Sequence, residues 1–423
     1  MNNKLTIWLL QTGEPLHLDS GNPRPMRAMN LANALVAAGH NVVVWSSSFY
    51  HQEKRHRVQG NARVKVSESL EIRLVKSPGY KRNIGVGRLW DHAVLASNLS
   101  KQLSVETTLP DVAFVGYPPI ETAAVMTKWL AAREVPCMVD VKDQWPLVFT
   151  NSLPEFLKPV GRIALSAYFY YGHRALRDAT AISAMADGFL KWAADFAGRP
   201  VSVLDRVVPL TVDTGKTDLS DLKDAGRWWD RQGIYDDGTQ RICFIGSHST
   251  AFDMEPVLQT ARLLDSAGNP FQFVICGDGE KSAIWKQKFK GLSNVYFPGW
   301  IDRSKIEALA KRSSAALAPY HSSDDFVQSI PNKVIDSLAL GLPILSPLRG
   351  EVRNLIAQHN IGLSYGAIVG KTLESCIQDL TEMPEFQRKL SENARKLFQE
   401  MFSFQKVYGG LVRHLELLAK KGR

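Results

Sequence analysis

The feature that most constrains the fold is a pattern that occurs twice: an apolar run of strand length, a glycine-containing turn or loop, and a helical segment. In the first half, residues 5–10 form the apolar run, and residues 26–38 have leucines at helical spacing before the strand-like NVVVWSS. In the second half, RICFIGS, a helical segment at 255–267 and FQFVICGDGE repeat this order. Strands that alternate with helices are typical of a parallel sheet covered by helices. We therefore expect an α/β protein built from two similar halves.

The predicted domain organisation follows from length and from one polar stretch. A chain of 423 residues exceeds what one ordinary hydrophobic core accommodates, so at least two domains are expected. The stretch at 211–238 is polar and is predicted to be a linker with a short helix around Trp228 and Trp229. It would separate an N-terminal domain at 1–210 from a C-terminal domain at 239–400, and a closing helix would follow at 401–423. Two such halves would leave a ligand cleft between them.

The composition excludes several classes of protein. With 45% hydrophobic and 22% charged residues, the chain has the composition of a soluble globular protein, and no apolar run is long enough to span a bilayer. The N-terminus lacks the features of a signal peptide, which disfavours a periplasmic sugar-binding protein. The four cysteines show no metal-ligand spacing, and Cys137, Cys243 and Cys276 fall in apolar runs. We expect a cytoplasmic protein with inert thiols.

The formal net charge of +9 is concentrated in one stretch. Between positions 50 and 92, ten Lys or Arg residues stand against four acidic residues. Such a stretch can face nucleic acid, anionic lipid or an acidic substrate, or it can be ordinary solvated surface. No nucleic-acid-binding motif accompanies it, so basic residues 54–88 are predicted to meet a membrane surface or a phosphate-bearing substrate. A second segment, residues 159–176, is an aromatic amphipathic helix that either lies at a membrane interface or packs in the core.

The stretch QSIPNKVIDSLALGLPILS, residues 328–346, predicts a phosphate site at the start of a helix. Pro331 suits the first turn, Ser329 is a candidate N-cap, and Gly341 ends the helix before a short buried strand. The N–H groups of Asn332 and Lys333 and the charge of Lys333 would attract phosphate. Asp336 lies one turn deeper, where it could accept hydrogen bonds from ribose. The alternative is a capped surface helix with an incidental lysine and aspartate.

Two further loops follow predicted strands and therefore lie where open α/β sheets bind ligands. In the first, Gly21 and Asn22 would let the backbone approach a ligand, and Arg24 and Arg27 would supply charge. This loop lacks the Gly-x-Gly-x-x-Gly pattern of dinucleotide-binding proteins. In the second, Asp143 comes just after the strand PCMVDVK, where it could act in catalysis or simply cap a turn.

Several motifs in order resemble those of the retaining GT-B glycosyltransferases of family four over nearly the whole chain. They are the Gly-rich loop before NALVAAGHNVVVWSS, then VPLTVD, CGDGE, NVYFPGW and PNKVIDSLALGLPIL. GNPRPMR and DQWP are similar to a bacterial subgroup that builds surface polysaccharides. The resemblance implies a GT-B fold, with two Rossmann-like domains facing across a cleft. It also implies transfer of a sugar, with a UDP-sugar as the expected donor and a glycan or polyprenyl-diphosphate-linked acceptor.

The resemblance also assigns residues. Asp336 would hold the ribose, Asn332 and Lys333 the diphosphate, and the backbone near Pro298 and Gly299 the base. The full predicted donor set is Gly21, Asn22, Arg24, Gly246, His248, Gly277, Pro298, Gly299, Gln328, Asn332, Lys333 and Asp336. The predicted acceptor set is Tyr117, Asp143 and Trp145, and the candidate catalytic residues are Asp143 and Lys333.

The chain departs from the family pattern at three places. Gln328 and Asp336 stand where the family often has two glutamates, so the first position has lost its charge. The loop GSHSTAFD offers only His248 where the family often has Arg and Lys for the diphosphate. Tyr117-Pro118-Pro119 replaces the usual His-x-Pro on the acceptor side.

The expected chemistry is electrostatic. Lys333, the helix N–H groups and the glycine loop would stabilise the leaving diphosphate, so no metal or other cofactor is expected, and no Asp-x-Asp motif is present. Transfer of a hexosyl or N-acetylhexosaminyl group with retention is the main hypothesis. The alternatives are a sugar-nucleotide epimerase on the same fold, which needs no acceptor, and an inactive nucleotide-binding scaffold.

Overall fold

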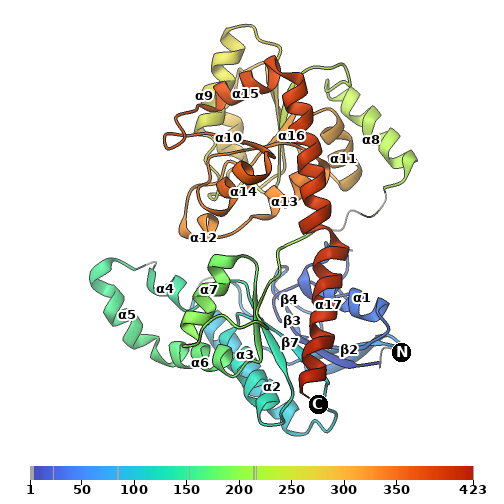
Figure 1. Ribbon diagram of the computed structural model, residues 1–423, viewed down its shortest axis with the longest axis vertical. Helices are drawn as coiled ribbons and strands as arrows, with labels where there is room; N and C mark the ends of the chain where they lie inside the picture. The colour runs from blue at the N-terminus through green and yellow to red at the C-terminus, as the bar shows by residue number, and fades with distance from the viewer. Residues whose placement is uncertain are drawn as a thin grey trace. The chain divides into compact units, whose positions relative to one another are not determined.

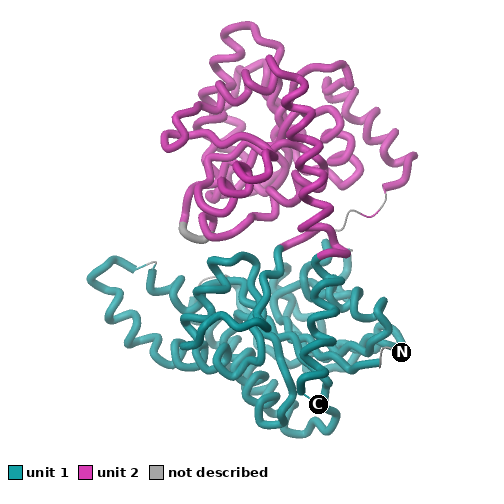
Figure 2. Tube along the Cα trace, viewed as in Figure 1, with its two compact units in different colours: residues 1–209, 407–423 teal, residues 210–406 magenta. Residues whose placement is uncertain are grey.

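The computed structural model describes residues 4–21, 23–82, 85–151, 153–212, 215 and 217–422 (Figure 1). The chain divides into two compact units (Figure 2). Unit 1 contains residues 1–209 and 407–423, and unit 2 contains residues 210–406. In the described part of the chain, no helix combines the length and the apolarity needed to cross a membrane.

Unit 1 contains an eight-stranded sheet in the order β10-β9-β8-β7-β1-β2-β6-β5. All neighbouring strands are parallel except the pair β5 and β6. The strands are β1 (Thr6–Leu10), β2 (Asn41–Ser47), β5 (Ala62–Ser67), β6 (Leu70–Val75), β7 (Val112–Tyr117), β8 (Cys137–Val141), β9 (Ala181–Ala184) and β10 (Arg206–Val207). A separate hairpin pairs β3 (Phe49–Tyr50) with β4 (Arg55–His56).

The helices of unit 1 cover this sheet, which explains why its central strands are rich in apolar residues. They are α1 (Arg27–Ala37), α2 (Val86–Ser104), α3 (Ile120–Ala131), α4 (Leu147–Asn151), α5 (Lys158–Ala164), α6 (Ser166–Arg177), α7 (Asp187–Phe196) and most of α17 (Phe404–Lys421), with a 3-10 turn at Glu155–Leu157. Every residue of β7 and of β8 is buried, which is why these strands are nearly continuous apolar runs. Three indole rings pack in the core, with Trp8 lying 5.2 Å from Trp45 and 5.4 Å from Trp129 between ring centroids.

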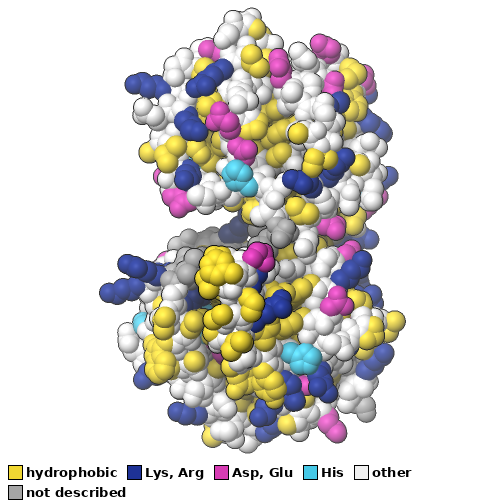
Figure 3. All heavy atoms as spheres, turned by 90° about the vertical axis from the view of Figure 1, so that its left-hand side faces the viewer, with side chains coloured by type: hydrophobic (Ala, Val, Ile, Leu, Met, Phe, Trp, Pro, Cys, Tyr) yellow, Lys and Arg dark blue, Asp and Glu magenta, His cyan; other side chains and the backbone are white. Residues whose placement is uncertain are grey.

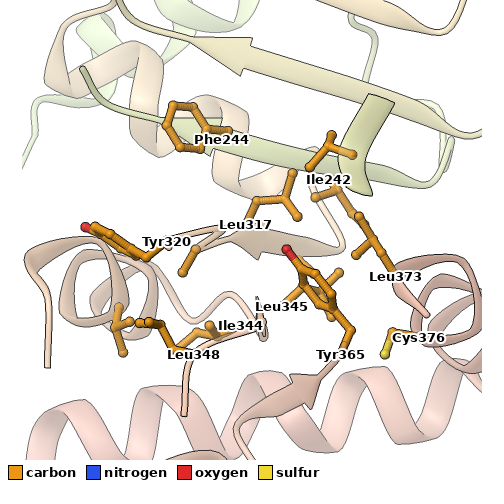
Figure 4. Close-up of a cluster of buried hydrophobic side chains, with 14 of the residues drawn as sticks. Ile242, Phe244, Leu317, Tyr320, Ile344, Leu345, Leu348, Tyr365, Leu373 and Cys376 are labelled. Atoms are coloured by element: carbon orange, nitrogen blue, oxygen red, sulfur yellow. The ribbon is translucent and has the colours of Figure 1, made fainter. Parts of the chain in front are cut away.

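Unit 2 contains a six-stranded, wholly parallel sheet in the order β13-β12-β11-β14-β15-β16. Its strands are β11 (Arg241–Ile245), β12 (Gln272–Cys276), β13 (Val295–Gly299), β14 (Ala315–Leu317), β15 (Ile344–Ser346) and β16 (Gly362–Ser364). Its helices are α8 (Leu219–Arg231), α9 (Glu255–Ser266), α10 (Ser282–Lys288), α11 (Arg303–Lys311), α12 (Asp324–Val327), α13 (Asn332–Leu340), α14 (Glu351–His359), α15 (Leu373–Glu382) and α16 (Pro384–Leu397), and a π-helical turn follows at Phe398–Phe402. Figure 4 shows apolar side chains of β11, β14 and β15 meeting Leu373 and Cys376 of α15 in its core.

The stretch 211–238, predicted as a linker, belongs to unit 2. Its helix α8 is anchored there because Trp229 is fully buried and its indole N–H donates to the carbonyl of Lys305, at 2.8 Å. Asp230 also pairs with Arg312 at 3.2 Å. Polar composition indicated a linker, but one buried tryptophan is enough to bind a polar helix to a core.

The predicted closing helix is divided between the units. Residues 407–423 of α17 belong to unit 1, where the His414 ring bonds the carbonyl of Leu204 at 2.8 Å and His40 contacts Glu416 at 3.0 Å. The chain therefore passes from unit 1 to unit 2 and back again.

The helix predicted at 159–176 is also divided, because Leu165 leaves helical geometry between α5 and α6.

A buried ion pair holds the centre of unit 1. Arg27, at the start of α1, lies 3.1 Å from Asp140 of β8, with side chains only 4% and 0% exposed. Arg27 also donates to the carbonyl of Val208 at 2.8 Å, and Asp140 accepts from Ser183 at 2.8 Å. Arg27 was expected to supply charge to a ligand loop. In the structure its guanidinium instead pairs with a buried carboxylate of the same protein.

Replacing Arg27 by Met should destabilise the protein by about 3–5 kcal/mol, because Asp140 would remain buried without its partner. The measurement is urea unfolding followed by circular dichroism. Exposed Arg388 provides a control, and Arg388→Met should change stability by less than about 0.5 kcal/mol. The double variant Arg27→Met/Asp140→Asn should recover part of the loss, and equal loss in both variants would contradict a charge-pair explanation.

Candidate functional site

The predicted donor residues of unit 2 gather where β11, β12 and β13 end. Gly246 follows β11, Gly277 follows β12, and Pro298 and Gly299 close β13. Backbone hydrogen bonds join these turns: the Gly246 N–H donates to the Cys276 carbonyl at 3.1 Å, and the Gly277 N–H donates to the Gly299 carbonyl at 2.7 Å. The carboxyl edge of a parallel sheet is where such folds bind ligands, so these turns form the floor of a candidate site.

Two of these positions require glycine. A Cβ on Gly277 would lie 1.9 Å from the carbonyl oxygen of Gly246, and a Cβ on Gly246 would lie 1.8 Å from Nζ of Lys333. Both residues also have positive φ, +126° and +148°. The backbones of the two turns therefore pack directly against each other, and the Lys333 side chain fills the space next to Gly246.

Helix α13 points its N-terminus into this region. Pro331 is the capping residue, no side chain caps the helix, and Gly341 ends it in the left-handed conformation with φ of 71°. The predicted cap Ser329 is wrong, because it precedes the capping position by two residues. The Lys333 backbone lies near enough to the Tyr320 hydroxyl to lower the pKa of that group, and Asn332 at the helix start is exposed.

Lys333 is the most constrained side chain of the site. Its ammonium donates to the Ile245 carbonyl and lies 4.1 Å from the ring centroid of Phe244 and 5.0 Å from that of Phe252. Burial lowers its pKa to about 8, although Asp336 opposes this shift. A cation held in a low-dielectric site beside a helix N-terminus attracts an anionic ligand strongly.

Four other predicted donor residues of unit 2 have intermediate exposure. Asp336 and Gln328 are partly buried, as are Pro298 and Gly299. Asp336 lies near enough to Lys333 and Tyr320 to shift the pKa of both groups. Gln328 directly follows α12, so it lies at the entrance to the α13 turn.

His248, predicted as a diphosphate ligand, lies in the loop after β11 and is held by contacts within unit 2. Its side chain is buried, its ring centroid lies 4.5 Å from that of Trp285, and Nδ1 lies 2.8 Å from the Ser282 hydroxyl. Burial also lowers its pKa, which disfavours the charged ring. Nδ1 of the ring therefore holds the loop GSHSTAFD against α10, whereas Nε2 is buried without a hydrogen-bond partner among the described residues and lies 3.4 Å from the position that a Cβ on Gly277 would take.

In unit 1, a cavity of about 200 Å³ lies where β1, β2, β7 and β8 end. Asp143, predicted as an acceptor-side residue, lines it together with Lys142, Glu14 and Gln11. Glu14 joins these elements: it pairs with Lys142, accepts from Gln11 at 3.1 Å, and accepts from the Ala28 N–H of α1 at 2.8 Å. The sequence analysis missed Glu14 and Lys142, although Glu14 lies in the loop after the first predicted strand and Lys142 ends the predicted strand PCMVDVK.

The other two predicted acceptor residues do not line this cavity among the described residues. Tyr117 is fully buried, and its hydroxyl donates to the Trp145 carbonyl at 2.6 Å. Trp145 is 6% exposed and packs against Phe149. Contact of Tyr117 with an acceptor stays a prediction, and in this structure its side chain is used in packing. The pair positions the loop that carries Asp143.

The far side of the same cavity carries cationic and aromatic groups. Lys54 lies 4.7 Å and Arg88 5.9 Å from the Tyr80 ring centroid. Burial and the charges of Lys54 and Arg88 lower the pKa of His51 to about 4. Burial, Arg88 and His51 lower the pKa of His92 to about 3. Both rings are therefore neutral at physiological pH.

The first-loop predictions remain on the surface. Gly21 is exposed with φ of +82°, and open space surrounds the position that a Cβ would take there. Arg24 is also exposed. Asn22 lies outside the described residues. Among the residues that the structure describes, no group of three or more His, Cys, Asp or Glu side chains could hold a metal ion.

Comparisons with known proteins agree with this architecture. Residues 239–380 match the family model described as "Glycosyl transferases group 1", and this range contains the glycine turns and α13. None of the curated proteins matches the sequence.

Three solved structures resemble the chain over nearly its whole length. Sucrose-phosphate synthase from Thermosynechococcus elongatus has a TM-score of 0.67 at 13% identity, covering 97% of this chain and 99% of its own. HepE from Anabaena, in complex with UDP, has a TM-score of 0.61 at 12% identity, covering 98% and 100%. WaaG, a glycosyltransferase involved in lipopolysaccharide biosynthesis, has a TM-score of 0.60 at 14% identity, covering 97% and 99%. The chain has the GT-B fold, as the sequence predicted.

Replacing Lys333 by Met should stabilise the ligand-free protein by about 1–2 kcal/mol at pH 7, because a buried charge is removed and lost cation–π contacts offset only part of the gain. The folded-state pKa, about 8, lies below the ordinary lysine value of 10.5, so the unfolded chain binds more protons between these values. Wild-type stability should therefore rise with pH across this window, and the advantage of the variant should shrink.

Urea unfolding at pH 7 and pH 9.5 measures this difference, with Lys290→Met, an exposed lysine of unit 2, as the control. The control should show neither the gain at pH 7 nor its loss at pH 9.5. A Lys333→Met variant that is less stable than the wild type at pH 7 would refute the buried-charge cost.

Proposed function

We propose that this protein is a glycosyltransferase that moves a sugar from a nucleoside diphosphate to an acceptor. The observation that carries the proposal is the arrangement in unit 2, where Lys333 and the N-terminus of α13 meet two glycine turns at the carboxyl edge of the sheet. A diphosphate needs close backbone approach and fixed positive charge, and this arrangement supplies both.

The donor is proposed to be a UDP-sugar, carrying a hexosyl or N-acetylhexosaminyl group. The UDP complex of HepE, a protein of the same fold, supports this choice. Asp336 would accept hydrogen bonds from the ribose, and the backbone at Pro298 and Gly299 would meet the base. Gln328 would contact the donor sugar as a neutral group. From the first loop of unit 1, Gly21, Asn22 and Arg24 are proposed to meet the diphosphate.

The proposed chemistry is stabilisation of the leaving diphosphate. As the bond from the anomeric carbon to the phosphate oxygen lengthens, negative charge grows on the diphosphate. Lys333 and the first turn of α13 would stabilise that charge by fixed electrostatics, so a metal ion is not needed in this proposal. Transfer is proposed to proceed with retention of anomeric configuration.

The acceptor is proposed to bind unit 1 at the cavity that Asp143, Lys142 and Glu14 line. Carboxylates and an ammonium beside aromatic rings suit the hydroxyl groups and ring faces of a sugar. We propose a glycan or polyprenyl-diphosphate-linked acceptor used in surface polysaccharide synthesis, in line with the described role of WaaG in lipopolysaccharide biosynthesis. Asp143 would contact the acceptor hydroxyl. The place of action would be the cytoplasmic face of the membrane.

Donor turnover with and without acceptor tests this function. Purified protein is incubated with UDP-sugars, polyprenyl-diphosphate glycans are added or omitted, and UDP release is measured. A transferase releases UDP faster with acceptor, and NMR of the product should show the anomeric configuration of the donor. An epimerase would convert the donor without acceptor. Binding without turnover would identify a scaffold, for which the neutral Gln328 is the supporting observation.

Replacing Asp336 by Ala should weaken UDP binding by about 1.5–3 kcal/mol, or roughly 10–150-fold, because a charged hydrogen-bond acceptor for ribose is lost. Calorimetry with UDP, GDP, ADP and CMP measures both the affinity and the choice of base. Glu374→Ala, which changes a partly buried acid in the first turn of α15, is the control and should bind as the wild type does. Unchanged UDP affinity in Asp336→Ala would remove the ribose role.

A further inference from the structure

The 3-10 turn at Glu155–Leu157 and helix α5 expose large apolar side chains in unit 1. The exposed fractions are 78% for Phe156, 61% for Val160 and 76% for Ile163. Steps of four and three residues place these three side chains on one side of a continuous helical segment. Tyr170 and Tyr171, on the following helix α6, are also exposed, at 59% and 50%. We call these five residues the apolar face.

The fold does not need the apolar face for its own packing. Helix α5 is held on its other side, where Gly161 lies against Leu153 so closely that a Cβ would come within 2.5 Å of its side chain. Helix α6 is held through Gly172, which packs against Tyr117 and Phe196, and through buried Ala175 and Leu176. Helix α6 thus has a buried inner side, whereas α5 buries none of its residues and contacts the rest of unit 1 through Gly161; the outer apolar groups of both helices remain in water.

Cations accompany the apolar face. Between positions 153 and 177 the chain has four Lys or Arg residues and one acid, Glu155. Lys158 pairs with Glu155, and Arg174 pairs with Asp178. Arg162 and Arg177 are exposed and form no ion pair among the described residues. Figure 3 shows hydrophobic side chains gathered on the surface of unit 1, with basic side chains around them.

The basic stretch at 54–88 is a weaker candidate for contact with anions. Arg57 is buried in an ion pair with Asp19, and Arg73 pairs with Glu71 and Glu106. Arg55 and Arg63 also have carboxylate partners. Much of the charge predicted to face a membrane is therefore neutralised within unit 1.

We propose that the apolar face docks on the surface of an anionic lipid bilayer. Phe156, Val160 and Ile163 would enter the boundary between headgroups and acyl chains, and the tyrosines would lie at headgroup level. Arg162 and Arg177 would contact lipid phosphates. This assignment does not require the proposed transferase activity, although a lipid-linked acceptor would reside on the same surface.

Charge favours a bilayer over a second copy of this chain. In a two-fold symmetric dimer, a surface patch meets the same patch of its partner. The apolar face would then bring its excess cations together, which is unfavourable. An anionic bilayer provides an apolar layer for these side chains and negative charge for the cations beside them.

Sedimentation of the full chain with vesicles tests the proposal. Vesicles with 30% phosphatidylglycerol in phosphatidylcholine are compared with pure phosphatidylcholine. The triple variant Phe156→Ser/Val160→Ser/Ile163→Ser should lower the partition coefficient at least about tenfold, because its inserted apolar area is lost. The variant Arg162→Glu/Arg177→Glu should abolish the preference for anionic vesicles, and high salt should weaken wild-type binding.

The control variant Val105→Ser/Leu219→Ser/Leu263→Ser removes three exposed apolar residues elsewhere and should bind vesicles as the wild type does. UDP affinity should be unchanged in all variants, which separates this proposal from the transferase proposal and confirms folding. Equal loss in the control, or no wild-type binding to anionic vesicles, would overturn the assignment. Wild-type self-association that the triple variant abolishes, without vesicle binding, would identify a second copy as the partner instead.

Discussion

The candidate site of unit 2 depends on one contact, that of the Lys333 ammonium with the end of β11. The lysine lies under Gly246 and between two phenylalanine rings, where water screens its charge poorly. Its position requires a glycine above it, because a Cβ there would lie 1.8 Å from Nζ. Gly277 in turn must approach the Gly246 carbonyl. Close packing in this region thus fixes the positions of the Lys333 charge, of Gly246 and Gly277, and of the start of α13.

Local signals in the sequence predicted much of this arrangement. Gly341 ends α13 and Ile344 begins a buried strand, as proline and glycine spacing indicated. The two strand–helix series predicted an α/β protein in two halves, the resemblance of ordered motifs implied the GT-B fold, and the solved structures of this fold confirm it. These features succeed because turn chemistry and hydrophobic periodicity act over a few residues.

The failures concern long-range burial, which local spacing does not contain. The sequence did not predict that His248 and Tyr117 are held by residues distant in sequence, Trp285 and Trp145. Arg27 was expected on a ligand loop, but its partner Asp140 comes from a strand more than a hundred residues later. Glu14 and Lys142 were missed for the same reason, since only the folded sheet brings β1 and β8 to one cavity. Side chains that hold a site and side chains that touch a ligand have the same polar chemistry.

The return of α17 to unit 1 also affects the order in which the protein is completed. Unit 2 is one continuous segment, so all of its residues are available before the last helix leaves the ribosome. Unit 1 lacks α17, which buries Leu411, Leu415 and Leu418, until all of unit 2 has been synthesised. The part of unit 1 that α17 contacts therefore stays uncovered while unit 2 is made. The unit that is made first is the unit that is finished last.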